Sequence, residues 1–174
     1  MLRNKTVKTH RKILYSNLRQ VKSIAIVWDA SKTDEFSTLV KFCQKMAESD
    51  TEVKIIGYFS GKNLPDQYTA QRYLTLIKKT ELNFFYLPVS ADTNAFIRNS
   101  FDVLIDLNFK KLLPLRYIST LSDAHLKIGL FESEKNNTIF DLMMDLKSPV
   151  GIEDYLKHVI YYLEMINSES VIIS

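Results

Sequence analysis

Polar side chains that could bind a ligand follow directly after apolar segments that are typical of β-strands. They are Asp29, Ser31, Lys32, Asp106, Asn108 and Asp145. Carboxylates gathered in one place can hold a divalent cation or act as a general base, and a serine hydroxyl and a lysine ammonium at a helix N-terminus can bind phosphate. In the alternative interpretation, these aspartates only end strands and cap helices, because their side chains accept backbone hydrogen bonds there. The residue types allow a ligand site without dictating a reaction.

Other motifs that would identify a reaction are missing from the sequence. The segment 29–33 has no glycine, so it lacks the close backbone approach of dinucleotide and phosphate loops. No serine is flanked by the glycines of a nucleophile elbow. His10, His125 and His158 have no partner at metal-ligand spacing, and Cys43 is the single cysteine. We therefore assign no catalytic residue, metal ligand or cofactor, and the sequence favours a protein that is not an enzyme.

The positive charge of the chain is concentrated at its start. Seven basic residues precede the first acidic one, which is Asp29: Arg3, Lys5, Lys8, Arg11, Lys12, Arg19 and Lys22. The net charge of the whole chain is +3, so the remainder is mildly acidic. A basic segment can neutralise phosphates, and His10 and Tyr15 offer rings on which bases can stack. The residues that we expect to contact RNA are Arg3, Lys5, Lys8, Arg11, Lys12 and Arg19.

The same segment allows two other interpretations. Its apolar residues Val7, Ile13, Leu14, Leu18 and Val21 recur at a spacing that predicts an amphipathic helix over residues 8–20. Such a helix could lie on an anionic membrane, although it has no Trp or Phe anchor. It could instead close one side of the domain with its charges in water.

Apolar runs and helical spacings alternate along the rest of the chain. Strands are predicted at 23–28, 53–59, 83–89, 101–107, 126–131 and 140–146. Helices are predicted from Ser31 or Thr33 to 47, over 68–82, from Ser90 or Asp92 to 97, from Pro114 to 121, and from Pro149 to 166. Near the end, residues 171–173 form an apolar patch that could add a strand to a partner or pack locally.

This alternation predicts one α/β domain with a doubly wound, mostly parallel sheet of five or six strands and helices on both faces, which is a Rossmann-like architecture. In such sheets ligands bind beyond the carboxyl ends of the strands, where the strand order reverses. We divide the chain into a basic arm (1–22), the domain (23–168) and a tail (169–174). The longest apolar runs are too short to span a membrane and no signal peptide opens the chain, so a cytoplasmic location is expected.

Four segments of the sequence resemble an uncharacterised family of small proteins from Bacteroidetes. They are 101–107 (FDVLIDL), 113–118 (LPLRYI), 127–129 (KIG) and 140–146 (FDLMMDL). The resemblance implies a bacterial, cytoplasmic, single-domain protein and no assigned activity. The strand 101–107 and the following helix and strand are also similar to the N-terminal half of heptosyltransferase-like glycosyltransferases. The Gly-Asp element of those enzymes is replaced here by residues 28–31 (WDAS), and no second nucleotide-sugar domain follows.

Two hypotheses follow from the sequence. The first is a non-enzymatic binding or accessory protein that contacts RNA or a ribosomal particle through the basic arm. The alternative is a small-ligand binder or enzyme for a nucleotide or sugar phosphate, with the ligand at the rim that holds Asp29 and Asp106. The sequence specifies neither a protein partner nor an oligomeric state.

Overall fold

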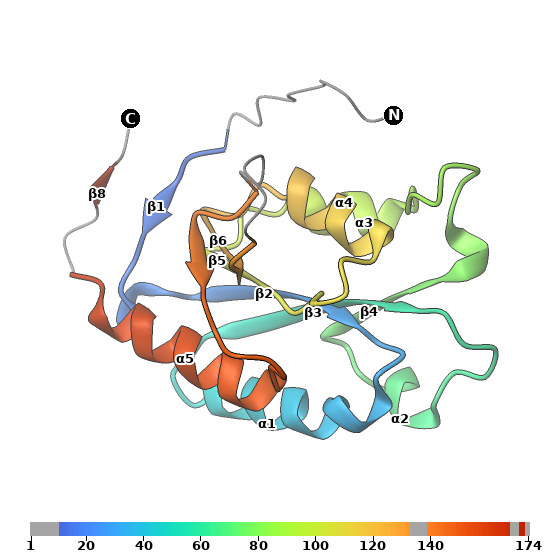
Figure 1. The fold of residues 1–174 in the computed structure, drawn as a ribbon, viewed down its shortest axis with the longest axis horizontal. Coiled ribbons are helices and arrows are strands. Elements are labelled where there is room, and N and C mark those ends of the chain that lie inside the picture. The colour runs from blue at the N-terminus through green and yellow to red at the C-terminus, as the bar shows by residue number, and fades with distance from the viewer. Residues whose placement is uncertain (1–10, 133–138, 168–170, 173–174) are drawn as a thin grey trace.

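A sheet of parallel strands runs through the middle of the protein, whose computed structural model describes residues 11–132, 139–167 and 171–172 (Figure 1). Its strands, in chain order, are β2 (Ser23–Asp29), β3 (Glu52–Phe59), β4 (Leu74–Lys78), β5 (Val103–Asp106), β6 (Leu126–Leu130) and β7 (Leu142–Met144). Across the sheet they lie in the order β4-β3-β2-β5-β6-β7. The predicted doubly wound α/β fold is confirmed, with six parallel strands in the described part of the chain.

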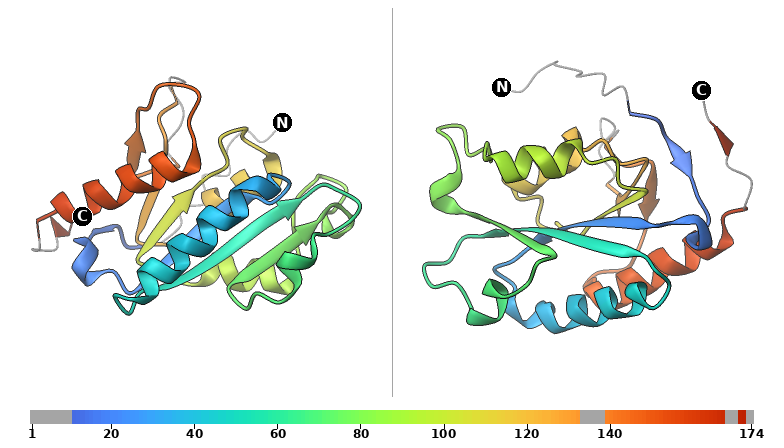
Figure 2. Two further views of the ribbon diagram at one scale, coloured as in Figure 1. Left: turned by 90° about the horizontal axis from the view of Figure 1, so that it is seen from below. Right: turned by 180° about the vertical axis from the view of Figure 1, so that it is seen from behind.

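Helices cover both faces of this sheet (Figures 1 and 2). They are α1 (Phe36–Ala47), the short α2 (Asp66–Thr69), α3 (Ala91–Arg98), α4 (Leu113–Leu121) and α5 (Ile152–Met165). Helices α1 and α5 share one apolar core with the sheet, and α3 and α4 share the other. The strand order reverses between β2 and β5, because β2 is connected to β3 on one side and β5 to β6 on the other.

Strand β2 shows why continuous apolar runs form the centre of the sheet. Ile24, Ile26 and Trp28 belong to the core under α1 and α5, whereas Ala25 and Val27 belong to the core under α3 and α4. Successive side chains of a strand point to opposite faces, so a strand covered on both faces must be apolar throughout. The predicted strands 23–28, 53–59, 101–107, 126–131 and 140–146 are confirmed by β2, β3, β5, β6 and β7.

The predicted helix starts are confirmed for α3 and α4. The Ser90 hydroxyl accepts a hydrogen bond from the Thr93 amide and caps α3. Pro114 lies in the first turn of α4.

The predicted cap of the first helix by Ser31 or Thr33 is wrong, because α1 starts at Phe36 after a 3-10 turn (Thr33–Glu35) and no side chain of the described residues caps it. Helix α5 starts at Ile152, three residues after the predicted start at Pro149, and the expected Glu153 and Asp154 lie in its first turn, at the positive end of its dipole.

The predictions for residues 68–89 are wrong. The expected helix 68–82 is replaced by α2, β4 and a 3-10 turn (Lys79–Glu81), and the expected strand 83–89 is a closed loop with a single bridge between Leu82 and Pro88. The apolar residues of β4 fit a helical spacing, but the strand pairs in parallel with Ile55 to Phe59 of β3. Pairing along the open edge of β3 outweighs a weak local helix preference.

The predicted amphipathic helix over 8–20 is also wrong for the described residues 11–20, and residues 8–10 lie outside the described part. The segment contains β1 (Leu14–Tyr15) and a 3-10 turn (Leu18–Gln20) capped by Asn17. Strand β1 pairs antiparallel with β8 (Val171–Ile172), so this part of the tail packs locally (Figure 2). The Leu14 amide donates to the His125 carbonyl, 3.1 Å away. Such long-range bonds replace those of a helix. None of the described helices is both long and apolar enough to cross a membrane.

Candidate functional site

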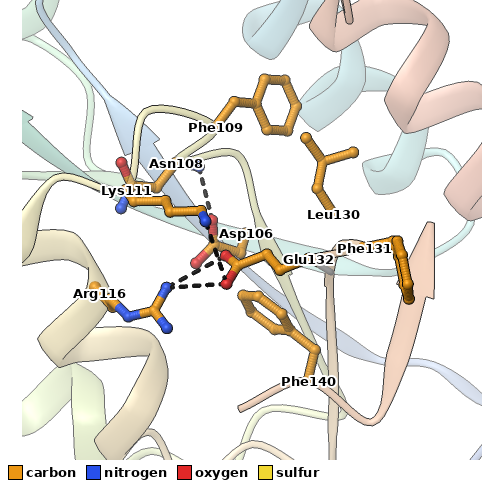
Figure 3. A pocket seen from close by; sticks show the side chains of 9 residues that line it. All are labelled: Asp106, Asn108, Phe109, Lys111, Arg116, Leu130, Phe131, Glu132 and Phe140. Carbon is orange, nitrogen blue, oxygen red and sulfur yellow. Dashed lines mark hydrogen bonds and ion pairs between the residues drawn. The ribbon is translucent and has the colours of Figure 1, made fainter. Parts of the chain in front are cut away.

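A cavity of about 260 Å³ opens at the carboxyl ends of β5 and β6, on the α4 side of the switch point (Figure 3). Its polar lining consists of Asp106, Asn108, Lys111, Arg116 and Glu132. Its apolar lining consists of Phe109, Leu130, Phe131 and Phe140. These residues come from the end of β5, the loop after it, the first turn of α4, and the segments that leave β6 and enter β7. The topology therefore concentrates polar groups where doubly wound sheets bind ligands.

Asp106 is the last residue of β5 and is buried. Its Oδ2 accepts a hydrogen bond of 2.5 Å from the Ser119 hydroxyl on α4, and its Oδ1 accepts one of 2.7 Å from the Asn108 amide. Burial raises the pKa of Asp106 to about 6, although both hydrogen bonds and the Arg116 charge act in the opposite direction. This carboxyl group thus changes its charge close to neutral pH.

The loop after β5 is held in one conformation by the Asn108 side chain. Its carboxamide oxygen accepts from the Leu112 amide at 2.9 Å, and its nitrogen donates to the Leu112 carbonyl at 3.0 Å. Between them, Lys111 has a φ of 56°, in the left-handed region that costs a lysine free energy and that glycine or asparagine adopts more readily. The loop keeps Lys111 in this strained conformation at the mouth of the cavity.

Lys111 and Arg116 converge on Glu132 at this mouth (Figure 3). The Arg116 Nη1 lies 3.2 Å from Glu132 Oε1, and the Lys111 Nζ lies 3.5 Å from Oε2. The carboxylate of Glu132 is largely buried, whereas both cations are partly exposed. Two cations that can reach solvent therefore share a single carboxylate.

The apolar wall of the cavity is set by a close approach at Gly129. A Cβ atom at this position would lie 2.3 Å from the Phe140 ring, so only glycine lets that ring rest on β6. Phe109 packs edge to face against Tyr155 of α5, with ring centroids 5.1 Å apart. Phe131 is the most exposed of the lining rings. An apolar ligand group could therefore lie against aromatic surface beside the charged mouth.

Comparison with known proteins gives a family and no activity. The model of a family of unknown function, DUF6913, matches residues 1–166. The chain belongs to DUF6913. No curated protein and no solved structure matches it. The expected membership of an uncharacterised family is confirmed, and the site must be interpreted from the geometry of this DUF6913 chain.

The sequence-predicted ligand residues are only partly brought together in the DUF6913 chain. Asp106 and Asn108 line the cavity, whereas Asp145 is exposed after β7 and does not. Within residues 11–132, 139–167 and 171–172, no three His, Cys, Asp or Glu side chains are grouped so that they could hold a metal ion. Asp29 and Asp106 end the neighbouring strands β2 and β5, and of the three aspartates Asp106 alone is in the lining of this cavity.

Asp29, Ser31 and Lys32 lie in the neighbouring loop of the switch point. Asp29 is buried and accepts a hydrogen bond from the Ser31 amide at 3.1 Å, as a turn-forming aspartate does. The Ser31 hydroxyl lies 2.9 Å from that of Ser60 and joins the ends of β2 and β3. Lys32 pairs with Glu35 at 3.8 Å and lies 5.9 Å from the centre of the Phe109 ring. These residues support the loop that borders the cavity.

Sequence reasoning missed Lys111, Arg116 and Glu132. A signal for Glu132 was present, because it follows the predicted strand 126–131 just as Asp106 ends its own strand. The two basic residues gave no signal of their own. Arg116 reads as an ordinary helix residue, and Lys111 stands beside the similar Lys110.

In the basic arm of the DUF6913 chain, one described arginine is paired within the fold and two other basic residues are exposed to solvent. Arg11 forms a bidentate ion pair with Asp141, at 2.8 and 2.6 Å, and also donates to the Ala124 carbonyl. Lys12 and Arg19 are exposed. Arg3, Lys5 and Lys8 lie outside the described residues. Arg11, which we expected to contact RNA, is therefore engaged within the protein.

Proposed function

We propose that this protein binds a small phosphorylated molecule in the cavity at the ends of β5 and β6. The observation that carries the proposal is the convergence of Lys111 and Arg116 on one carboxylate at the mouth of a cavity at the switch point. Parallel α/β sheets bind their ligands at this position. The proposal requires binding and no catalytic step.

The charges at the mouth favour an anion. Arg116 lies in the first turn of α4, whose N-terminal end carries a positive partial charge, and Lys111 directly precedes the N-cap residue of that helix, Leu112. Arginine and lysine together are typical phosphate ligands. Glu132 occupies the position between the two cations. A ligand phosphate would replace the Glu132 carboxylate there and retain both cations as partners.

The size and the aromatic wall limit the rest of the ligand. A volume of about 260 Å³ is close to the lower bound of roughly 300 Å³ for pockets that enclose drug-sized ligands, so a small molecule fits best. The Phe131 and Phe140 rings offer a surface for a planar or apolar group. A nucleotide has both a planar base and a phosphate. A sugar phosphate has the phosphate but no planar group.

Calorimetric titration of the whole protein with inorganic phosphate, nucleoside phosphates and sugar phosphates tests the proposal. We expect binding by at least one of these classes, and a loss of about tenfold or more in affinity for Arg116→Ala and for Lys111→Ala. Lys110→Ala is the matched control, because Lys110 is an exposed neighbour that does not line the cavity. A failure of all three classes to bind, or equal losses in all three variants, would contradict the proposal.

Glu132→Gln determines the sign of the ligand's charge. Removal of the negative charge frees Lys111 and Arg116 from their partner, so we expect a phosphate to bind more tightly to this variant. A cationic ligand would bind more weakly, because it would lose the carboxylate that lies between the two cations. Weaker phosphate binding to Glu132→Gln than to the unmodified protein would overturn the proposal.

RNA binding by the basic arm is the second candidate, and the exposure of Lys12 and Arg19 supports it. A Lys12→Ala/Arg19→Ala variant should bind RNA more weakly than the unmodified protein and with a smaller dependence on salt, because each phosphate contact releases counterions. Identical, salt-insensitive binding of both proteins would exclude the arm as an RNA site.

A further inference from the structure

Three consecutive aromatic side chains project into solvent from the loop between β4 and α3. Phe84, Phe85 and Tyr86 are 91%, 69% and 60% exposed, and Val89 is 52% exposed. The loop extends away from the end of the sheet, at the right-hand side of Figure 1. Burial of a phenylalanine ring is favourable, so adjacent exposed rings can contribute binding free energy when a partner covers them. We propose that this aromatic loop, residues 82–90, inserts into the surface of an anionic lipid bilayer.

The backbone of the aromatic loop is suited to an apolar environment. The amides of Phe85 and Leu87 both donate to the Asn83 side-chain oxygen, at 2.9 and 3.0 Å. The Tyr86 amide donates to the Asn83 carbonyl at 3.0 Å, and the Asn83 amide donates to the Leu87 carbonyl at 2.9 Å. Lipid cannot replace the hydrogen bonds that water gives to amides, so segments that enter a bilayer must satisfy them internally. This loop does so for the four amides named.

The rings form a preformed wedge. Phe84 and Phe85 pack edge to face, with centroids 5.5 Å apart, and Tyr86 has a φ of 59° that turns the chain tightly beneath them. The Asn83 bonds fix this turn before any contact with lipid. Membrane insertion therefore needs little further ordering of the backbone, whose entropy would otherwise oppose binding.

Two lysines at the start of the aromatic loop favour an anionic bilayer. The segment 82–91 carries no charged side chain; Lys78 and Lys79 lie exposed before it, and Asp92, in the first turn of α3, lies exposed after it. The Glu81 carboxylate is bonded back to the Lys78 amide at 2.6 Å. Aromatic side chains at a tip with lysines behind them match the order of acyl chains and anionic headgroups in a membrane surface.

A second protein is a less suitable occupant. The convex tip would need a complementary pocket in the partner, and a partner strand that added to the loop would find the four named amides already bonded within it. A dimer formed through the aromatic loop is nevertheless an outcome that the test below distinguishes.

Flotation of the full chain with vesicles tests the inference, using phosphatidylcholine with or without about 30% phosphatidylserine. The unmodified protein should float with the anionic vesicles, and Phe84→Ala/Phe85→Ala should lower the partition coefficient about tenfold or more. The matched control is Tyr161→Ala/Tyr162→Ala, which removes another exposed edge-to-face pair, with centroids 5.6 Å apart on α5. That control should float as the unmodified protein does.

Two further measurements separate the alternatives. Phe85→Trp should show a blue-shifted emission with anionic vesicles, because the new indole leaves water. Vesicle binding that survives in Phe84→Ala/Phe85→Ala would attribute binding to other basic surfaces and overturn the inference. A lipid-free dimer that Phe84→Ala/Phe85→Ala converts to a monomer, seen by light scattering, would identify a second copy as the occupant and also overturn it. Because these variants leave Lys111 and Arg116 intact, the phosphate site is tested separately.

Discussion

Two carboxylates, Asp106 and Asp141, are both largely removed from solvent but have different partners. Asp141, just before β7, accepts a bidentate pair of hydrogen bonds from Arg11 and a third from the Lys127 amide at 2.8 Å. Asp106, at the end of β5, accepts bonds from two neutral donors among the described residues, the Ser119 hydroxyl and the Asn108 amide. A carboxylate with its own cation can hold the fold together. A carboxyl group buried without one destabilises the fold when it ionises, and such groups cluster at functional sites.

The largest expected effect is on the paired carboxylate. Arg11→Ala leaves Asp141 without its cation at a site that is nearly closed to solvent, so it should lower the free energy of unfolding by about 3–5 kcal/mol. Urea denaturation at neutral pH measures the loss. Lys12→Ala, at the exposed neighbour, should stay within about 0.5 kcal/mol of the unmodified protein. Equal effects of the two substitutions would mean that the Arg11 pair does not hold the arm.

The unpaired carboxylate should respond in the opposite direction. Since the pKa of Asp106 is raised to about 6, the folded state binds this proton more tightly than the unfolded chain does. This stabilising contribution is complete below the unfolded pKa of about 4 and is lost as the pH rises through 6. Asp106→Asn removes the ionisation, so it should raise the free energy of unfolding by about 2 kcal/mol at pH 7.5.

The pH dependence provides the control for that substitution. The advantage of Asp106→Asn should shrink towards pH 4, where the unmodified side chain is also neutral. Chemical denaturation at several pH values measures both curves. A constant difference across this range would attribute the effect of the substitution to packing and not to charge.

Lys127 allows the same comparison of paired and unpaired buried charges to be tested with a cation. Its amide supports Asp141, but its ammonium group is buried and donates only to the Thr120 carbonyl at 3.0 Å among the described contacts. Burial, with the Arg11 charge, lowers the pKa of Lys127 to about 8. The unfolded chain therefore binds this proton more tightly between pH 8 and about 10.5, and stability should rise with pH across that window.

Lys127→Met should abolish that rise and add about 1–2 kcal/mol to the free energy of unfolding at pH 7, because no charge is buried. The gain should fade as the pH approaches 10. Denaturation curves of the two proteins at pH 7 and 10 measure it. A variant that is less stable than the unmodified protein at pH 7 would show that the ammonium is needed by the fold.

The smallest expected effect concerns the strained loop of the cavity. Lys111→Gly relieves the left-handed conformation and should stabilise the protein by up to about 1 kcal/mol while it weakens phosphate binding. Thermal unfolding with and without phosphate measures both effects. Lys110→Gly is the matched control, and a gain in stability there but not at Lys111 would contradict the strain at Lys111.

The sequence predicted the parts of the fold that depend on long apolar runs. Strands β2, β3 and β5 are covered on both faces and therefore read as continuous apolar segments. Strand β4 was missed because its five residues, at the edge of the sheet, also fit a helical spacing. The arm was misassigned because its backbone partners, such as His125, lie more than a hundred residues away and leave no local pattern.

The candidate site, like the fold, was predictable only in part. Asp106 and Asn108 could be located because a strand end is visible in the sequence and the fold class places strand ends at one edge. Lys111 and Arg116 could not, because their role depends on the direction in which the loop and α4 hold them relative to Glu132. The difference between Asp106 and Asp141 was likewise invisible, since it depends on which carboxylate Arg11 reaches.

The difference between these two carboxylates is tested most directly by a carbon-13 NMR titration of the aspartate carboxyl groups, with Asp106 assigned from the Asp106→Asn variant. We predict that the Asp106 signal titrates with a pKa of about 6. Addition of the phosphate ligand identified by calorimetry should move this signal, because the ligand would lie in the same cavity. If Asp106 titrates near pH 4 and its signal does not change when the ligand is added, the result would contradict a binding site at the end of β5.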